Sequence, residues 1–261
     1  MKRIILKLLH DAKRRSLIKD VADFFLPRYC CMCDRRMTAD ERHICTPCLR
    51  TLNRIEYEGG EVHSVIERLF WGKIPVEKAT SMFSYKGENT RKILHNIKYF
   101  DRPEVASFLA ELFVKENRKS DFFHGIDAII PVPLATAKKR KRGYNQSDYI
   151  ARGLSRETGI PVIQDAAIRT VNNPTQTMLS HQQRKDNVKD IFTLIKPKAV
   201  EGKHILIIDD VITTGATILS LAQEINKAKS VKFSFFSLAF AGQLIKTNLP
   251  GTTTSTTQTD N

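Results

Sequence analysis

Two adjacent carboxylates are the part of the sequence best suited to chemistry. Asp209 and Asp210 directly follow the four apolar residues 205–208. Because an isoleucine-rich run of this length is typical of a buried parallel strand, the two acidic side chains are expected at its carboxyl end, where open α/β sheets bind ligands. Carboxylates at this position suit the vicinal hydroxyls of a sugar and, with them, Mg²⁺, a cation that prefers oxygen ligands.

The turn after the acidic pair has the composition of a phosphate-binding loop. It consists of Thr213, Thr214, Gly215, Ala216 and Thr217, and it opens an apolar helix that is predicted to run through residues 218–225. Free backbone N–H groups at a helix start, with three hydroxyl groups nearby, form a cradle for a phosphate dianion. Gly215 lets the backbone approach the ligand closely because it has no Cβ atom. Helix capping, the simpler interpretation, accounts for one Asp or Thr but not for the whole pattern.

Four cysteines form two pairs with the spacing of a zinc ribbon. Cys30 and Cys33 make one Cys-x₂-Cys pair, and Cys45 and Cys48 make a second. Four thiolates complete a tetrahedral site and leave no open position, so a structural Zn²⁺ is predicted. The segment between the pairs is short and charged, and metal binding worth about 10–16 kcal/mol would substitute for the core that it lacks.

Two residues near these pairs leave alternatives open. Cys31 is the spare thiol, but a first pair of Cys31 with Cys33 is also compatible with the sequence. His43 is a weaker candidate ligand, and a solvent-facing histidine is the favoured interpretation. Because structural disulfides are rare in the cytoplasm, metal binding accounts better for the paired cysteines.

Length and charge limit the classes of protein to which the chain can belong. Its 261 residues, 41% of them hydrophobic, suffice for one ordinary domain and a small module. A net charge of +14 favours polyanionic partners, namely phosphorylated substrates, nucleic acid or an anionic surface, although a solvated basic face is equally compatible. No apolar run could span a bilayer and no signal-peptide cleavage site follows the N-terminus, so a cytoplasmic protein without a transmembrane segment is predicted.

Apolar patterning predicts strands that alternate with helices. Strands are expected at residues 79–85, 127–130, near 162, at 205–208 and at 231–240, and helices at about 62–70, after Glu88 or Asn89 as a cap, at 103–115, 147–157 and 218–225. This alternation is typical of a parallel, doubly wound α/β sheet. The organisation that follows is an N-terminal helix and zinc ribbon at residues 1–60, an α/β domain at 75–245 and a disordered threonine-rich tail at 246–261.

Two polar segments between these elements could also contact a ligand. Residues 138–142 are five consecutive cations that can meet a pyrophosphate or a nucleic-acid backbone, but a mobile surface loop is the simpler interpretation. For a single strand of DNA, Tyr144 or Tyr99 could add base stacking. Residues 176–188 lie in a long polar connection of the kind that often forms an active-site lid.

Taken in order, these motifs resemble the ComF family, the competence-associated branch of the type I phosphoribosyltransferases. The resemblance extends from about residue 25 to residue 239. It rests on the cysteine pairs, residues 83–86 and 91–99, Pro131-Val-Pro133, residues 140–146 and 176–179, Arg184, Asn187, Val188, and the acidic threonine-rich loop. The fold implied by this resemblance is that of a type I phosphoribosyltransferase with a small N-terminal zinc-binding module.

The resemblance also implies a site for phosphoribosyl pyrophosphate (PRPP) with Mg²⁺. Asp209 and Asp210 would hold the ribose 2′- and 3′-hydroxyls, and residues 213–217 would hold the 5′-phosphate. The implied pyrophosphate loop is Val132, Pro133 and Leu134. Arg184, in a flexible loop at about residues 176–189, would steady the leaving pyrophosphate, so the implied catalytic residues are Asp209, Asp210 and Arg184.

Two classes of function follow from the resemblance. The first is a PRPP-dependent transferase, in which positioning and electrostatics supply most of the catalysis. The second is a binding protein of DNA uptake and natural transformation, with single-stranded DNA and the uptake machinery as partners. A phosphoribosyltransferase of nucleotide metabolism or salvage without a DNA role is the alternative, since fold alone does not fix function. No residue identifies the acceptor substrate.

Overall fold

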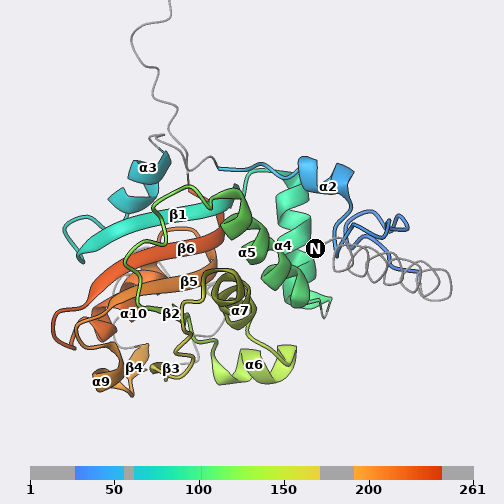
Figure 1. Ribbon diagram of the computed structural model, residues 1–261. Coiled ribbons are helices and arrows are strands. Elements are labelled where there is room, and N and C mark those ends of the chain that lie inside the picture. Colours follow the sequence, from blue (N-terminus) through green and yellow to red (C-terminus); the bar gives the residue numbers. More distant parts are fainter. Residues whose placement is uncertain (1–26, 56–61, 101, 171–190, 243–261) are drawn as a thin grey trace, which may run out of the picture.

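The apolar run before the acidic pair forms the middle of the central strand. In the computed structural model, which describes residues 27–55, 62–100, 102–170 and 191–242, this strand is β5 (His204–Ile212). Its neighbours are β6 (Lys232–Phe240) and β2 (Ala128–Pro131), and β1 (Val76–Ser84) lies on the far side of β6. The order is β1-β6-β5-β2 with every pair parallel, as Figure 1 shows.

Strand β5 continues past the acidic pair to Ile212, beyond its predicted end at residue 208. Asp209 lies opposite Ser237 of β6, and the pairing continues to Ile212 opposite Phe240. On the other side of β5 the ladder ends at the pair of Pro131 with Ile208. The two carboxylates therefore lie on extended backbone where one edge of β5 has lost its strand partner.

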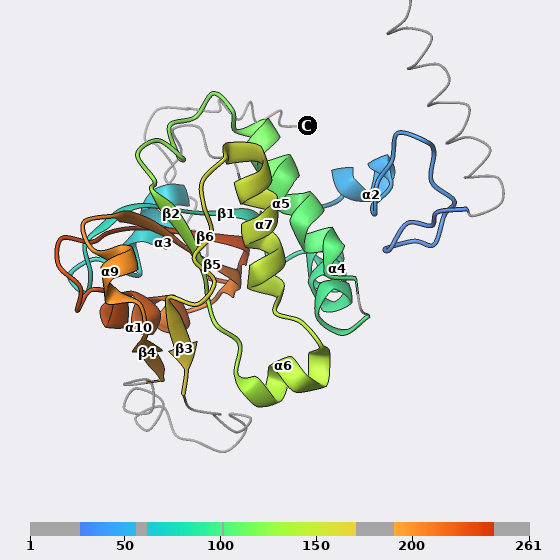
Figure 2. The ribbon, with the colours of Figure 1, turned by 60° about the horizontal axis from the view of Figure 1, so that its bottom comes forward.

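Helices cover both faces of the sheet, as predicted for a doubly wound fold. One face packs against α4 (Glu88–Tyr99), α5 (Glu104–Glu116) and α7 (Gln146–Thr158), and the other against α3 (Val62–Arg68), α9 (Pro197–Val200) and α10 (Ala216–Ile225), as Figures 1 and 2 show. On β6, Phe235 packs into one of these layers and Phe236 into the other, and both are fully buried. Burial on both faces explains why the central strands are so apolar.

The first helical layer, formed by α4, α5 and α7, depends on a close crossing of α5 and α7. A Cβ atom on Gly153 of α7 would lie 2.3 Å from the backbone oxygen of Ser107 and 2.9 Å from Cβ of Ala110, both on α5. Because real Cβ contacts do not approach this closely, only glycine permits the crossing. The crossing holds α7 closely against α5.

The basic segment is helical, so the expectation of a mobile loop is wrong. Helix α6 (Thr136–Arg142) begins after the buried Ala135 and ends at Gly143, which has a left-handed φ of 81°. The cations of its last turn lie at the negative end of the helix dipole and stabilise the helix. A run of like charges in the sequence does not show this effect. Figure 2 shows α6 apart from the helical layers.

Three smaller details also differ from the prediction. Near Val162 the expected strand is a single bridge to Ile129. A separate antiparallel pair, β3 (Ala167–Arg169) with β4 (Phe192–Leu194), was not predicted because three residues are too few to show a period. Helix α4 follows Gly87 in extended conformation, with no side-chain cap from Glu88 or Asn89.

The cysteine-containing segment packs against the first helical layer. It comprises two chain reversals and the short helix α2 (Thr46–Arg50), and its apolar side chains share one core with α4 and α5. Arg42 forms an ion pair of 3.2 Å with Glu111 of α5.

No helix within the described ranges is long and apolar enough to cross a bilayer. Three predicted features lie outside the described residues: the N-terminal helix, the segment 176–188 with Arg184, and the threonine-rich tail.

Candidate functional site

The acidic pair is half-buried and carries a lysine counter-ion. Nζ of Lys98, in the last turn of α4, lies 2.9 Å from Oδ2 of Asp210. Burial lowers the pKa of Lys98, but the Asp210 carboxylate raises it, and the net shift is upward. The ammonium group therefore stays charged and neutralises one of the two carboxylates.

Asp209 is the more perturbed carboxylate. Its Oδ1 accepts a hydrogen bond of 2.8 Å from the Asp210 backbone N–H and a longer one of 3.4 Å from the Ser147 hydroxyl at the start of α7. Burial first, and the charge of Asp210 second, raise the pKa of Asp209 to about 7. A group with this pKa changes its charge near neutral pH.

The threonine-rich turn joins β5 to α10 as the sequence predicted. Gly215 adopts a left-handed φ of 74° and immediately precedes α10, so Ala216 and Thr217 already belong to the helix. Thr213 and Thr214 are exposed, and Thr217 is half-buried. The hollow at the turn is small, about 20 Å³, so a phosphate would lie over the helix start rather than inside a closed pocket.

A cleft of about 240 Å³ brings the predicted parts together. Its walls include the expected sugar and phosphate ligands Asp209, Asp210 and Thr217 and the expected pyrophosphate loop Val132, Pro133 and Leu134. The loop is held in place by Asn145, whose Nδ2 donates a hydrogen bond of 3.0 Å to the Val132 backbone oxygen. Thr213, Gly215 and Ala216 of the turn line the adjoining hollow, which shares Asp209 and Thr217 with the cleft, whereas Thr214 lines neither.

Cations outnumber the carboxylates in this cleft. Lys98, Lys138, Arg142 and Arg169 line it together with Asp209 and Asp210. Burial lowers the pKa of Arg169, which lies over the Phe192 ring at 5.6 Å. An excess of positive charge in a partly buried cleft suits a ligand with several negative charges.

Two buried donors of the cleft lack an acceptor within the described part of the chain. They are Nε2 of Gln146, a residue that is 2% exposed, and Nε of Arg169. The other end of the Gln146 amide is fixed, because Oε1 accepts a hydrogen bond of 2.6 Å from Arg142. A buried donor without an acceptor costs about 1–3 kcal/mol, so such donors fit a site for an acceptor-rich anion.

A larger basic hollow adjoins the cleft along α6. It has a volume of about 830 Å³, shares Lys98, Lys138 and Arg142 with the cleft, and adds Arg140 and Lys141. Tyr99 lies at this junction with 64% of its surface exposed, and the Arg142 guanidinium lies 5.2 Å from its ring centre. Tyr144 is only 8% exposed and donates a hydrogen bond to the Ile97 backbone oxygen, so its predicted role in base stacking is wrong.

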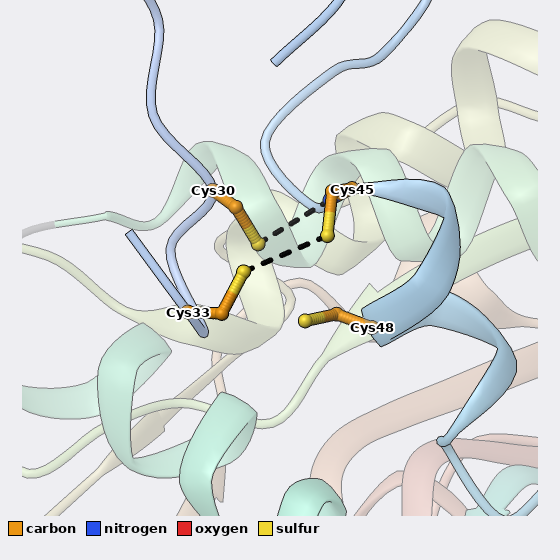
Figure 3. Close-up of side chains that lie close together, drawn as sticks. All are labelled: Cys30, Cys33, Cys45 and Cys48. Carbon is orange, nitrogen blue, oxygen red and sulfur yellow. Dashed lines mark hydrogen bonds between the residues drawn. The ribbon is translucent and has the colours of Figure 1, made fainter. Parts of the chain in front are cut away.

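Four cysteine sulfurs converge at the N-terminal module. Figure 3 shows Cys30, Cys33, Cys45 and Cys48 turned toward a common centre, and their sulfur atoms all lie within 4.8 Å of one another. A tetrahedral zinc site with Zn–S bonds of about 2.3 Å requires sulfurs about 3.8 Å apart. Sγ of Cys33 lies 3.7 Å from Sγ of Cys45, which fits this requirement. The four cysteines can therefore hold a metal ion.

The alternative ligands lie outside this cluster. Cys31 is buried in the shared core, where burial raises its thiol pKa to about 12. The His43 ring packs against Phe108 at 5.6 Å and is half-buried, so the expectation of a solvent-facing histidine is wrong. Burial lowers the pKa of His43.

Glu41 holds the two halves of the cysteine module together. Its carboxylate accepts hydrogen bonds from the backbone N–H groups of Thr46 (2.8 Å) and Thr38 (3.0 Å) and from the Arg35 guanidinium (2.7 Å). The Thr46 and Thr38 N–H groups, followed by Arg35, lower the pKa of Glu41 to about 2. One carboxylate therefore fixes the backbone at Thr38, between the two cysteine pairs, and at Thr46, inside the second pair.

Comparison with known proteins places the chain in a family. The profile of the phosphoribosyl transferase domain matches residues 99–247, more than half of the chain. DNA utilization protein YhgH of Shigella flexneri is 39% identical over 134 residues, 50% of this chain and 58% of that protein. Competence protein F of Haemophilus influenzae is 32% identical over 134 residues, 51% of this chain and 58% of that protein. The chain belongs to the ComF family of phosphoribosyl transferase domain proteins.

This assignment confirms the predicted family and the α/β fold class. Competence protein ComFC of Bacillus subtilis is also similar, 31% identical over 111 residues that cover 42% of this chain and 43% of that protein. The chain spans little more than half of the length of the first two of these relatives. Among solved structures, glutamine PRPP amidotransferase of Bacillus subtilis aligns with 54% of this chain and 30% of its own, with 21% identity and a TM-score of 0.36.

The structure adds residues to the ComF cleft that the sequence analysis did not assign. Lys98, Asn145, Gln146, Ser147 and Arg169 all line it. Asn145, Gln146 and Ser147 follow the basic run at the start of a predicted helix, and this position was a usable signal. Lys98 lies in the segment 91–99 that carries the resemblance, but neither Lys98 nor Arg169 was assigned to the site, because a cation on a predicted helix or in a short strand is most often a solvated side chain.

Proposed function

We propose that the cleft binds PRPP, or a related ribose 5-phosphate compound, together with Mg²⁺. The observation that carries this proposal is the shared cleft, which is lined by the carboxylates Asp209 and Asp210, by Thr217 at the start of α10, and by the loop 132–134. Carboxylates accept hydrogen bonds from sugar hydroxyls, and backbone N–H groups at a helix start bind phosphate. The spare donors on Gln146 and Arg169 add to the preference for a phosphorylated ligand.

The reaction class that fits this ligand is phosphoribosyl transfer. The bond between C1′ and the pyrophosphate oxygen breaks, pyrophosphate leaves with the electron pair, and a nucleophile forms the new bond to C1′. Bound Mg²⁺ would neutralise charge on the pyrophosphate, and oxygen ligands such as those of Asp209 and Asp210 suit it. The residues of the chain would fix the ribose by its hydroxyls and the 5′-phosphate by the turn 213–217. Arg184 remains the proposed partner of the leaving pyrophosphate.

Turnover and acceptor are tested together by pyrophosphate release. PRPP and Mg²⁺ are incubated with a panel of nucleobases and amines, and released pyrophosphate is measured. The transferase proposal predicts release that depends on one acceptor class and disappears when Asp209 and Asp210 are both replaced with Asn. Binding of PRPP without release from any acceptor would favour a binding protein. Release with a free nucleobase, without any affinity for DNA, would favour the salvage alternative.

A second candidate function is the binding of single-stranded DNA beside the cleft. The relatives' names, DNA utilization protein and Competence protein F, motivate a role in DNA uptake. The supporting observation is the basic hollow along α6 with the exposed ring of Tyr99, since cations neutralise phosphates and an exposed ring stacks on bases. Arg142 also lines this hollow, but its guanidinium donates a hydrogen bond to the Gln146 side chain of the cleft, so replacing it would disturb both sites.

The DNA candidate is tested by neutralising the three exposed cations Lys138, Arg140 and Lys141 with Gln. Affinity for labelled single-stranded DNA at physiological salt should fall, and its salt slope should become shallower by about two, since each phosphate contact on a single strand contributes about 0.7. The control replaces three exposed lysines elsewhere, Lys119, Lys198 and Lys229. Equal losses in both variants would indicate nonspecific attraction, and an unchanged slope in the first variant would reject α6 as the DNA site.

For the cysteine module we propose structural Zn²⁺. The convergence of four thiols supports it, and two backbone N–H groups, of Met32 and Cys45, donate to the Cys30 sulfur at 3.4 and 3.3 Å and would stabilise a thiolate. Five free cysteines also fit a reducing compartment, the cytoplasm.

A further inference from the structure

Lys98 lies at the junction of three hollows. It lines the cleft of the acidic pair, the basic hollow along α6, and a third hollow of about 550 Å³ on the outer side of α4. No other described residue except its neighbour Tyr99 lines all three. The side chain is 26% exposed, so its ammonium group is confined by the walls but still reaches solvent.

The ion pair with Asp210 conflicts with the proposed ligand. Lys98 occupies Oδ2 of Asp210 at 2.9 Å, and that carboxylate is a proposed acceptor for a ribose hydroxyl. Sugar hydroxyls and an accompanying divalent cation compete with the ammonium group for the carboxylate oxygens, and the cation also repels it. Binding of the ligand therefore weakens the Lys98–Asp210 pair.

The displaced ammonium group has a suitable anion nearby. The loop 132–134 and the cations Lys138 and Arg142 line the same cleft, so a pyrophosphate at the loop would lie within the cleft that Lys98 already lines. A lysine side chain has a flexible four-carbon stem and three rotatable donors, so it can change partners while its helix stays in place. Helix α4 is anchored independently of the ion pair, because Ile93, Leu94 and Ile97 are buried in the core.

We infer that Lys98 is a specificity-determining residue that exchanges its pairing with Asp210 for a pairing with the pyrophosphate group when PRPP binds. This inference rests on the proposed function. Lys98 would select PRPP over ribose 5-phosphate, because both ligands displace it from Asp210 but only PRPP offers it a new anionic partner. A lysine with a purely structural role would affect both ligands equally.

Calorimetry with two ligands separates these roles. Dissociation constants for PRPP and ribose 5-phosphate are measured with Mg²⁺ for the full-length wild type and for Lys98→Met, Lys98→Arg and Lys92→Met. Lys92 is the matched control, an exposed lysine on the same helix that lines only the third hollow. Circular dichroism and thermal unfolding verify that each variant is folded.

The expected result is a loss of selectivity in Lys98→Met. Its preference for PRPP over ribose 5-phosphate should fall about tenfold or more, the usual effect of one charge-assisted contact. Lys98→Arg should retain part of the preference and Lys92→Met all of it. Equal changes for both ligands, or no change, would overturn the inference while leaving the proposed site intact. A wild type that binds neither ligand would instead overturn the proposed function and this inference with it.

Discussion

Nδ2 of Asn96 donates a hydrogen bond of 2.6 Å to the backbone oxygen of Cys31, and so joins the cleft helix α4 to the cysteine module. The next residues of α4 continue this connection. The Ile97 oxygen accepts from Tyr144 at 2.6 Å, and Lys98 pairs with Asp210. Three consecutive residues of one helix therefore contact the cysteine module, the turn between α6 and α7, and the acidic pair. A change in the cysteine module is expected to reach the cleft.

Replacing Asn96 with Leu tests this connection. The variant leaves the Cys31 oxygen without its donor in a buried place, which should lower the free energy of unfolding by about 1–3 kcal/mol. Urea denaturation measures the loss, and affinity for ribose 5-phosphate should fall as well. Replacing Asn117, whose side chain bonds only to the Phe113 oxygen within its own helix end, provides the control. Unchanged stability and affinity would show that the module and the cleft are independent.

Metal analysis tests the cysteine site. Wild-type protein should contain about one zinc per chain. Replacing Cys45 with Ser should remove the metal and lower the unfolding temperature, because the module then loses a tetrahedral ligand, and chelation of the wild type should do the same. Replacing Cys31 with Ala should leave the metal bound, since Cys31 lies outside the cluster. Full metal retention after loss of both Cys45 and Cys48 would reject the site.

Gly215 is predicted to be irreplaceable for two separate reasons. Its φ of 74° disfavours any side chain, and a Cβ atom would lie 2.9 Å from Cε1 of Phe70. Gly143 has a similar φ of 81° but nothing within 4 Å of the added atom, so Gly143→Ala measures the backbone effect alone. That effect should be about 1–2 kcal/mol. Gly215→Ala should cost more in thermal unfolding; equal costs would mean that Phe70 moves aside freely.

Protonation of Asp209 should make stability depend on pH. Burial raises its pKa from 3.8 to about 7 in the fold, so between these values the folded state holds a proton that the unfolded state has lost. The contribution of this group to the unfolding free energy is therefore greatest below about pH 4 and declines as the pH rises to about 7. Asp209→Asn removes this decline. In urea titrations, the unfolding free energy of Asp209→Asn relative to that of the wild type should increase as the pH rises from about 4 to about 7. A difference between the two proteins that does not vary with pH would contradict the raised pKa.

Long, periodic elements and local motifs were readable from the sequence, whereas contacts between distant residues were not. Ile205, Ile207 and Ile208 predicted a buried strand because both of its faces are covered, and the spacing of the cysteines predicted their convergence. The pairing of Lys98 with Asp210 joins residues that are adjacent only through the folded topology, so no local pattern contains it. Tyr144 was misjudged for the same reason, since it is buried where its hydroxyl meets Ile97, a residue 47 positions earlier in the chain.

The central claim is that Asp209 and Asp210 form the sugar end of a PRPP site, and isothermal titration of PRPP in the presence of Mg²⁺ tests it most directly. The matched control for Asp209→Asn with Asp210→Asn is the pair Asp40→Asn with Asp165→Asn, which removes the same charge from exposed positions. We predict saturable, Mg²⁺-dependent binding by the wild type and the control, and binding weaker by about a hundredfold or more in the Asp209, Asp210 variant. No binding by the wild type, or equal affinity in the wild type and the Asp209, Asp210 variant, would contradict the claim.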